Sequence, residues 1–267
     1  MEIEELANHV ADTTFFHFPW GHAHLGTVLG IQLTKFMVLE LIAAALMILM
    51  FTGLARRIKS GSPARGPFWN GLELLLVFIR DEVARPSIGK HDADKFLPLL
   101  WNLFFFILLC NMLGLLPWAG SPTASLAVTG ALALITFGTV LFTGMTKFGV
   151  GRYWLTLIPH MDLSPGLRIV MVPMIFVIEV FGLFVRHAVL AVRLLANMFA
   201  GHLVLAVIVS FIVMVANAFF VIVAGVTVAS LAAAAAMTLL ELFFAFLQAY
   251  IFTFLSALFI GMAVHPH

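Results

Sequence analysis

The sequence contains one apolar stretch so long that it decides what the chain can fold into. From Leu203 to Val264, a run of 62 residues, Glu241 is the single formally charged side chain. Two helices that cross a bilayer need only about 40 apolar residues together. The whole chain is 63% hydrophobic and 10% charged, whereas soluble proteins average about 25% charged residues. We therefore predict an integral membrane protein, which excludes secreted and cytosolic domains, disordered chains and DNA-binding modules.

The order of apolar and polar segments predicts an all-α membrane protein with about five membrane helices and one short interfacial helix around 72–79. The excess apolar length near the C-terminus means either additional crossings or long, tilted helices, and composition alone allows both. The predicted segments are an extracytoplasmic N-terminal arm at 1–32, a first transmembrane helix at 33–56, a basic cytoplasmic loop with the interfacial helix at 57–95, a transmembrane hairpin at 96–147, a cytoplasmic loop at 148–167 and the long last helices at 168–264.

Prolines mark two of the expected helix boundaries. Pro86 is expected to stop the interfacial helix, because proline lacks the backbone N–H that a helix interior needs. Pro98 is expected in the first turn of the next helix, where that missing N–H costs nothing.

The placement of basic residues predicts the orientation in the membrane. Eight Lys and Arg residues lie between Arg56 and Lys95 and three between Lys147 and Arg168, whereas the first 32 residues contain none. In membrane proteins, an excess of Lys and Arg marks the cytoplasmic loops. Both basic stretches are therefore expected in the cytoplasm, with the N-terminus outside and, if the tail crosses twice, the C-terminus inside.

Histidine and cysteine patterns give little support for a metal site. The His22-Ala23-His24 spacing in the N-terminal arm is weaker evidence for metal than for a solvated polar arm. Cys110 is the single cysteine and lies in an apolar run, which excludes a disulfide framework and a cysteine-based metal site. We expect no cofactor and no metal.

Three charged residues in the last third of the chain share one helix face. Glu179, Arg186 and Arg193 are spaced by seven residues, which returns to nearly the same side of an α-helix. A charge at bilayer depth costs about 2.5–3.5 kcal/mol on insertion scales, so we expect such residues to be paired or functional. Glu179 and Arg186 are equally compatible with a structural ion pair. Arg193 has no acid within reach on the C-terminal side of its own segment, which implies a carboxylate from elsewhere in the chain or from a partner.

Further polar residues follow on the same apolar segments. Asn197 lies one turn beyond Arg193 and continues its stripe, whereas His202 faces roughly the opposite way. Glu241 and Gln248 are again seven residues apart and share a face. Because histidine changes charge near neutral pH, this set favours a proton path over a binding pocket. A packed, neutral histidine is the simpler alternative for His202.

These residues occur in a pattern that resembles the F-type ATP synthase subunit a family in its bacterial form. The stretch Arg193-Leu-Leu-Ala-Asn197-Met-Phe-Ala-Gly201-His202 resembles the arginine motif of that family, and Glu241 with Gln248 resembles its last helix. Further matches are Pro173, Glu179 and Arg186 upstream of that motif and Asn111, Gly114, Pro117 and the Pro122-Thr123 pair in the hairpin. The resemblance covers about residues 30–264.

The resemblance implies a proton-conducting stator subunit of a rotary ATP synthase in a bacterial inner (plasma) membrane. Its expected partners are a ring of small membrane hairpin subunits (subunit c), the peripheral stalk subunit b, the rest of the synthase and the lipid bilayer, with no nucleic acid. Two offset half-channels would open to opposite sides of the membrane, and the last two helices would lie long and steeply tilted against the ring. The subunit would not synthesise or hydrolyse ATP itself, and the sequence contains no phosphate-binding G-x-x-x-x-G-K-[ST] loop.

The same resemblance implies a role for each polar residue. In that scheme the gate between the half-channels is Arg193, the outer proton relay is His202 with Glu241, the supports of Arg193 are Gln248 and Asn197, and the inner half-channel residue is Glu179. His187 departs from the family pattern, because relatives often have proline there. Ser125 and Ala127 stand where relatives have Asp or Asn, so Asn111 is kept only as a lining residue of the entry path.

Two other functions stay open on the sequence. A proton-coupled secondary transporter is the main alternative, although such folds usually show repeated halves and no second copy of the Arg193 region is present. A membrane haem protein would use His160, His187 or His202 as axial ligands. His187 and His202 lie on one segment, whereas a bis-histidine site needs ligands from facing helices, which makes this alternative the weaker one.

Overall fold

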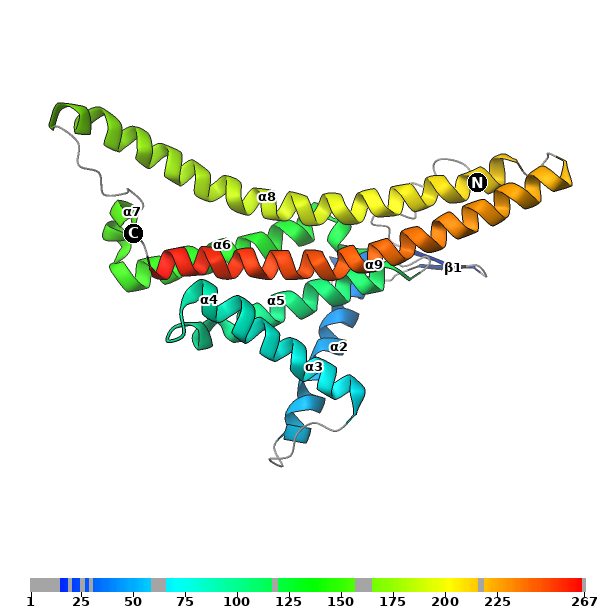
Figure 1. Ribbon diagram of the computed structural model, residues 1–267, viewed down its shortest axis with the longest axis horizontal. Helices are drawn as coiled ribbons and strands as arrows, with labels where there is room; N and C mark the ends of the chain where they lie inside the picture. The colour runs from blue at the N-terminus through cyan, green and yellow to red at the C-terminus, as the bar shows by residue number, and fades with distance from the viewer. Residues whose placement is uncertain are drawn as a thin grey trace. The chain divides into compact units, whose positions relative to one another are not determined.

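The computed structural model describes residues 15–18, 21–24, 27–28, 31–58, 66–116, 120–156, 165–215 and 219–265. Within these ranges, five helices are long and apolar enough to cross a membrane, which confirms the predicted all-α membrane protein (Figure 1). They are α2 (Lys35–Ile58), α5 (Ala93–Gly114), α6 (Leu126–Phe148), α8 (Pro165–Met214) and α9 (Phe220–Val264).

The last two helices account for the excess apolar length near the C-terminus. Helix α8 has 50 residues and α9 has 45. At a rise of about 1.5 Å per residue each helix is roughly 65–75 Å long, more than twice the ~30 Å thickness of a bilayer core. The structure thus confirms two long C-terminal helices, and within the described residues the apolar length does not form additional membrane crossings.

A continuous helical segment replaces the short interfacial helix expected around 72–79. It consists of α3 (Pro67–Phe78), the π-helix η1 (Ile79–Ala84) and α4 (Arg85–Ile88). Its hydrogen bonds widen in η1, where the Arg85 N–H donates to the carbonyl five residues earlier.

Both prolines that were expected to mark helix boundaries lie elsewhere in the helices. The prediction that Pro86 stops the interfacial helix is wrong, because Pro86 sits in the first turn of α4 and follows a π-helix. That segment ends instead at Gly89, whose φ of 98° is left-handed. Helix α5 begins at Ala93, so Pro98 lies inside the helix and not at its first turn.

The chain divides into two compact units, and helices α5, α6, α8 and α9 each contribute to both. The first unit comprises 1–63, 104–129 and 194–250, and the second comprises 64–103, 130–193 and 251–267.

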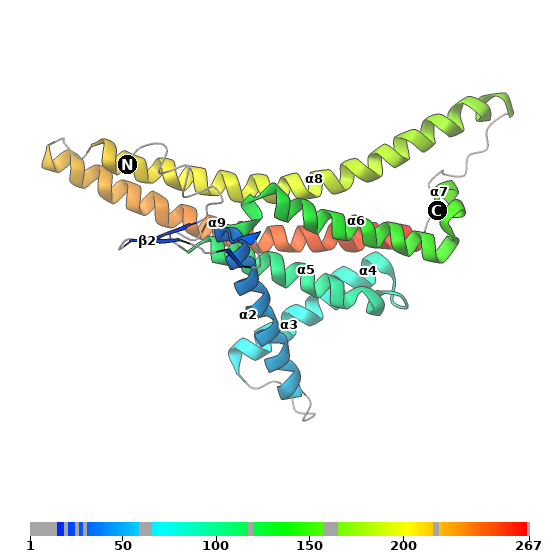
Figure 2. The ribbon, with the colours of Figure 1, turned by 180° about the vertical axis from the view of Figure 1, so that it is seen from behind.

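In the first unit, the part of α8 after Leu194 and the part of α9 before Tyr250 run side by side in both views (Figures 1 and 2). Helix α5 packs on α9 through an edge-to-face contact of Phe104 and Phe246, with ring centroids 5.7 Å apart. Ala245 and Ala249 are fully buried, and such small side chains allow helices to approach closely.

The predicted N-terminal arm contains short strands that the sequence analysis did not anticipate. Strand β1 (Phe15–Phe18) pairs antiparallel with β2 (Gly21–His24), and β3 (Thr27–Val28) pairs with β4 (Ile31–Gln32). Both pairs precede α2.

In the second unit, side-chain hydrogen bonds join α5 to α3 and α6 to α9. The indole nitrogen of Trp101 donates to the Leu76 carbonyl at 3.1 Å. The hydroxyls of Thr136 and Ser256 lie 3.4 Å apart and are both buried. The predicted cytoplasmic loop at 148–167 contains a short helix, α7 (Val150–Thr156), that the sequence did not reveal.

Candidate functional site

The site of greatest chemical interest in the first unit is a close approach of α9 to α8 at Gly201. A Cβ atom at Gly201 would overlap Oε1 of Glu241 and would lie 3.1 Å from its Cδ. Real Cβ atoms do not approach other atoms so closely. The absence of a side chain at position 201 therefore makes room for the Glu241 carboxyl group against the backbone of α8.

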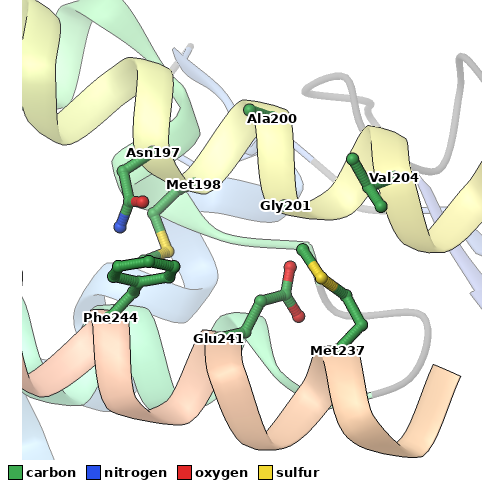
Figure 3. Close-up of a pocket in the computed structure, with 8 residues that line it drawn as sticks. All are labelled: Asn197, Met198, Ala200, Gly201, Val204, Met237, Glu241 and Phe244. Carbon is green, nitrogen blue, oxygen red and sulfur yellow. The ribbon is translucent and has the colours of Figure 1, made fainter. Parts of the chain in front are cut away.

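A cavity of about 150 Å³ lies beside this contact. Figure 3 shows the Glu241 carboxyl group pointing from α9 toward α8 and the Asn197 amide pointing from α8 toward α9. The lining residues are Asn197, Met198, Ala200, Gly201 and Val204 from α8 and Met237, Glu241 and Phe244 from α9. A cavity of this size with polar groups in its wall can hold ordered water molecules.

Glu241 is buried without a full set of hydrogen bonds. The residue is 5% exposed, and its Oε2 has no hydrogen-bond partner among the residues that the structure describes. A buried carboxylate that is ionised and unpaired is very costly. Glu241 therefore needs a proton or water from the cavity, which suits a group that takes up and releases protons.

Arg193 and Gln248 are also incompletely satisfied. Two nitrogens of the Arg193 guanidinium, Nε and Nη2, are buried and have no hydrogen-bond partner in the described ranges. Gln248 is 5% exposed, and its Nε2 is likewise buried without a partner there. The sequence leads us to expect no acid within reach of Arg193 on the C-terminal side of its segment, and no ion pair of Arg193 occurs among the described residues.

His202 is half-buried and directly follows Gly201 on α8. Lys35, at the start of α2, interacts electrostatically with His202 and is itself 2% exposed. Among the described residues, no hydrogen bond or ion pair joins His202 to Glu241. The pairing of these two side chains therefore stays a prediction, and the residue that meets the Glu241 carboxyl group is Gly201.

Glu179 and Arg186 form the structural ion pair that their spacing left open. Arg186 Nη2 lies 3.1 Å from Glu179 Oε2, and Arg186 Nε donates to the Gly182 carbonyl at 3.1 Å. Both side chains of the ion pair are more than a third exposed. Glu179 thus has a partner on its own helix, in contrast to Glu241.

His187 is a packed histidine in the second unit. Its Nδ1 donates to the Leu183 carbonyl at 2.9 Å, and its ring lies between Phe137 and Phe259 at centroid distances of 5.1 and 4.9 Å. Nε2 is buried without a partner in the described ranges. The position noted as a departure from the proline of relatives is therefore filled by an imidazole that packs between aromatic rings.

A buried polar network in the hairpin is the main feature that the sequence did not reveal. Asn111, predicted only as a lining residue, donates from Nδ2 to the Ala245 carbonyl of α9 at 3.3 Å. Its Oδ1 accepts a hydrogen bond from Thr123 at 2.6 Å, and the Thr123 hydroxyl lies 2.6 Å from that of Ser121. The sequence signals for this network were the family matches at Asn111, Gly114 and the Pro122-Thr123 pair, which did not show that these residues contact one another.

Metal ligands do not gather in the described part of the chain, which holds no group of three or more His, Cys, Asp or Glu side chains. His22 lies in strand β2, and its side chain and that of His24 fall outside the described features. His160, one of the histidines of the haem alternative, lies outside the described residues.

The comparison with known families decides between the remaining functions. The family model described as "ATP synthase A chain" matches residues 37–261. The chain belongs to the ATP synthase subunit a family. This membership confirms the resemblance seen in the arginine motif and sets aside the secondary transporter and haem alternatives.

Bacterial members of the subunit a family are similar to this chain over most of its length. ATP synthase subunit a of Myxococcus xanthus (strain DK1622) is 41% identical over 244 residues, which are 90% of this chain and 76% of the relative. The protein of the same name from Chloroherpeton thalassium (strain ATCC 35110 / GB-78) is 38% identical, with 97% and 76% covered. ATP synthase subunit a 2 of Chlorobaculum tepidum (strain ATCC 49652 / DSM 12025 / NBRC 103806 / TLS) is 39% identical, with 97% and 72% covered.

Membership in the subunit a family assigns a coarse function to this chain. It is a multi-pass membrane subunit that takes part in proton transport within the ATP synthase, and it translocates ions without carrying out the catalysis itself. The predictions of a proton-transport subunit that is not catalytic alone are confirmed at this level.

Proposed function

We propose that this subunit a conducts protons through two offset half-channels, with Arg193 as the gate between them. The observation that supports the proposal most directly is the Arg193 guanidinium, which has two buried nitrogens without a hydrogen-bond partner in the described ranges. A buried cation is stable only with a counter-charge. The carboxylates of the subunit c ring would supply that charge in turn, and the guanidinium would block a direct leak between the half-channels.

In the outer half-channel, Glu241 and His202 are proposed as the proton relay. The cavity beside Glu241 would bring water to the carboxyl group, and a carboxyl group with an unpartnered oxygen can accept a proton from that water. His202 directly follows Gly201 on α8 and would exchange protons with Glu241 through the same water, because no hydrogen bond or ion pair joins the two side chains among the described residues. Histidine suits this role because it titrates near neutral pH.

Asn197, Gln248 and Glu179 complete the proposed path. Asn197 points into the cavity from α8, and Gln248 has a buried amide nitrogen that is free to donate. Both would orient Arg193. Glu179 would line the inner half-channel, where its ion pair with Arg186 would keep it charged beside the path without a proton-carrying role of its own.

The proposed placement in the membrane follows from the distribution of Lys and Arg. The arm at 1–32 would lie outside, the loops at 57–95 and 148–167 would lie in the cytoplasm, and the C-terminus would be inside. The first helix at 33–56, the hairpin at 96–147 and the ion-translocating helices at 168–264 would cross a bacterial inner membrane. Helices α8 and α9 are too long to stand upright within ~30 Å of hydrocarbon, so we propose that they lie steeply tilted against the ring. Subunit b would be a further partner.

The experiment that tests the gate is ATP-driven proton uptake into inverted membrane vesicles. Wild-type protein, Arg193→Ala and the surface control Arg152→Ala are compared at matched assembly; Arg152 is an exposed residue of α7. We expect Arg193→Ala to abolish uptake while ATP hydrolysis continues, and Arg152→Ala to behave as wild type. Uptake that survives in Arg193→Ala would make Arg193 a structural charge.

The relay is tested by exchanging its two members. If His202 and Glu241 work as a pair, the double exchange His202→Glu with Glu241→His retains more proton uptake than either single Ala substitution. An exchange that is as inactive as the single variants removes the pairing and leaves Glu241 to act alone.

A further inference from the structure

Three buried side chains of the first unit form a directed chain of hydrogen bonds that ends on α9. Thr123 donates its hydroxyl proton to Asn111 Oδ1 at 2.6 Å. Because a hydroxyl has one proton to give, the 2.6 Å contact between Ser121 and Thr123 must be a bond donated by Ser121. Asn111 then donates from Nδ2 to the Ala245 carbonyl at 3.3 Å. Ser121, Thr123 and Asn111 are all fully buried.

The first member of this hydrogen-bond series, Ser121, is held in place by the backbone around it. A Cβ atom at Gly114 would lie 2.5 Å from Ser121 Cβ and 2.9 Å from Ser121 Cα, so glycine is required for the close return of the chain after α5. Thr123 lies in the 3-10 turn η2 (Pro122–Ala124), where the Ala124 N–H donates to the Ser121 carbonyl at 3.0 Å. The turn fixes the direction in which Thr123 meets Asn111.

The end of this chain lies between the two polar residues of α9 that the proposed function uses. Ala245 follows Glu241 by four residues and precedes Gln248 by three, so the three residues lie on one helix face. All three are buried. Successive residues of an α-helix are about 100° apart around its axis. If α9 rotated by that angle, the Glu241 carboxyl group would turn away from Gly201 and the cavity.

We propose that Asn111, oriented by Thr123 and Ser121, is a positioning residue that sets the rotation and axial position of α9 and thereby holds Glu241 at the cavity. The inference rests on the proposed role of Glu241 in proton transfer. Apolar contacts between helices specify rotation weakly, whereas a side-chain amide bound to one carbonyl specifies it directly. Fully satisfied buried networks of this kind are known to fix a single arrangement.

The test compares two substitutions of Thr123 that differ in one hydroxyl group. Thr123→Val keeps the shape but removes the donor to Asn111, whereas Thr123→Ser keeps the donor. ATP-driven proton uptake is measured at matched assembly across a range of pH. We expect Thr123→Val to lower uptake by about tenfold to a hundredfold, as for other small displacements of a reacting group, and to shift the midpoint of the pH profile. Thr123→Ser should restore both the rate and the profile.

A milder variant and a matched control guard against a general loss of structure. Ser121→Ala removes only the outermost donor, and we expect a smaller loss with a pH shift in the same direction. Thr136→Val removes a buried hydroxyl that also joins α9 to the hairpin, but in the second unit; it should leave the pH profile unchanged. An unchanged profile in both Thr123→Val and Ser121→Ala, or an equal shift in Thr136→Val, would overturn the positioning role.

Glu241→Gln separates this inference from the proposed function. If Glu241→Gln pumps as wild type, the proposed relay itself fails. If Glu241→Gln is inactive and Thr123→Val behaves as wild type, only the positioning role of Asn111 is wrong.

Discussion

Two arginines of α8 share a helix face but differ in their surroundings. Arg186 Nη2 binds Glu179 at 3.1 Å, and its Nε donates to the Gly182 carbonyl. Arg193, seven residues later, has two buried nitrogens without a partner among the described residues. We call a polar group complete when the structure gives it a charged partner and incomplete when it has a buried nitrogen or oxygen without a hydrogen-bond partner. In this sense Arg186 is complete and Arg193 is incomplete.

The two glutamates show the same contrast. Glu179 is paired and more than a third exposed, whereas Glu241 is buried beside a cavity with an unpartnered oxygen. A buried polar group without a partner costs about 1–3 kcal/mol, and more when it is charged. Such groups persist where a partner from outside the chain or a mobile proton completes them. Under the proposed function, the groups that lack partners, Arg193 and Glu241, are the ones that attract or exchange the proton, whereas the paired groups are not.

The strongest test of this contrast substitutes both glutamates by glutamine. Glu241→Gln removes the carboxyl group that is proposed to carry the proton, and we expect ATP-driven proton uptake to fall at least about a hundredfold, the usual contribution of a positioned acid–base group. Glu179→Gln should retain most of the uptake. Equal losses in the two variants, measured at matched assembly in inverted vesicles, would contradict the distinction between paired and unpaired carboxyl groups.

A second test adds a methyl group at the closest approach of α8 and α9. In Gly201→Ala the new Cβ would overlap Glu241 Oε1, so the carboxyl group has to move. We expect proton uptake to fall about tenfold or more, since small displacements at a reacting group are costly. Glu241→Asp, which shortens the side chain by one methylene, should recover part of the loss in the double variant.

The control for the added methyl group is Gly138→Ala in α6, where a Cβ would meet nothing within 4 Å. That variant should pump as wild type. If the two glycine variants lose activity equally, or if Glu241→Asp recovers nothing, the contact at Gly201 does not position the carboxyl group.

A third, smaller effect is expected at the complete ion pair. Arg186→Ala leaves the Glu179 carboxyl group without its partner but free to take up a proton, so we expect the unfolding free energy to fall by no more than about 3 kcal/mol, the cost of a polar group without a partner. The exchange of Glu179→Arg with Arg186→Glu keeps the pair and should preserve both stability and proton uptake. Thermal unfolding in detergent measures the first and vesicle assays the second. A complete loss of uptake in the exchanged variant would show that the order of charges along α8 matters. The ion pair would then take part in proton transport, as the incomplete groups are proposed to do.

Much of the fold was predictable because it depends on local pattern. The apolar runs predicted the five candidate spans, and the seven-residue spacing offered the ion pair of Glu179 with Arg186 as one of two readings. The arginine motif is sufficient to show the resemblance to the subunit a family. Each of these inferences needs only neighbours within one helix or a linear match of residues.

The remaining features depend on which distant segments meet. Asn111 and Ala245 are separated by 134 positions, and periodicity within one helix carries no information about such a contact. The fit of Glu241 against Gly201 likewise requires the pairing of α8 with α9. The predicted helix stop at Pro86 is wrong for a different reason. The rule that proline ends a helix assumes α-helical hydrogen bonds before it, whereas here a π-helix precedes Pro86 and the helix continues.

The smallest effect on stability is expected at Asp81, a partly exposed carboxylate that has arginine partners. Asp81 accepts hydrogen bonds from Arg80 Nε and Nη2, both at 3.0 Å, and from Arg85 Nη1 at 2.7 Å. The hydrogen bond from Arg80 is the main reason why the pKa of Asp81 is lower than its ordinary value. The same bond raises the pKa of Arg80, but arginine stays charged over the whole accessible range, so only the carboxylate adds a pH dependence.

The sign of that dependence follows from the lowered pKa. A carboxylate whose pKa is lowered by folding stabilises the protein above its unfolded-state pKa of about 3.9 and loses that contribution as the pH falls through the folded-state pKa. Asp81→Asn should therefore lower the unfolding temperature slightly at pH 7 and not at all once both states are protonated in acid, while proton uptake stays at the wild-type level. Unfolding temperatures of the two proteins in detergent, compared at both ends of this range, measure the difference. A large loss of uptake in Asp81→Asn would contradict the proposal that fully paired polar groups take no part in proton transfer, because Asp81 has two arginine partners.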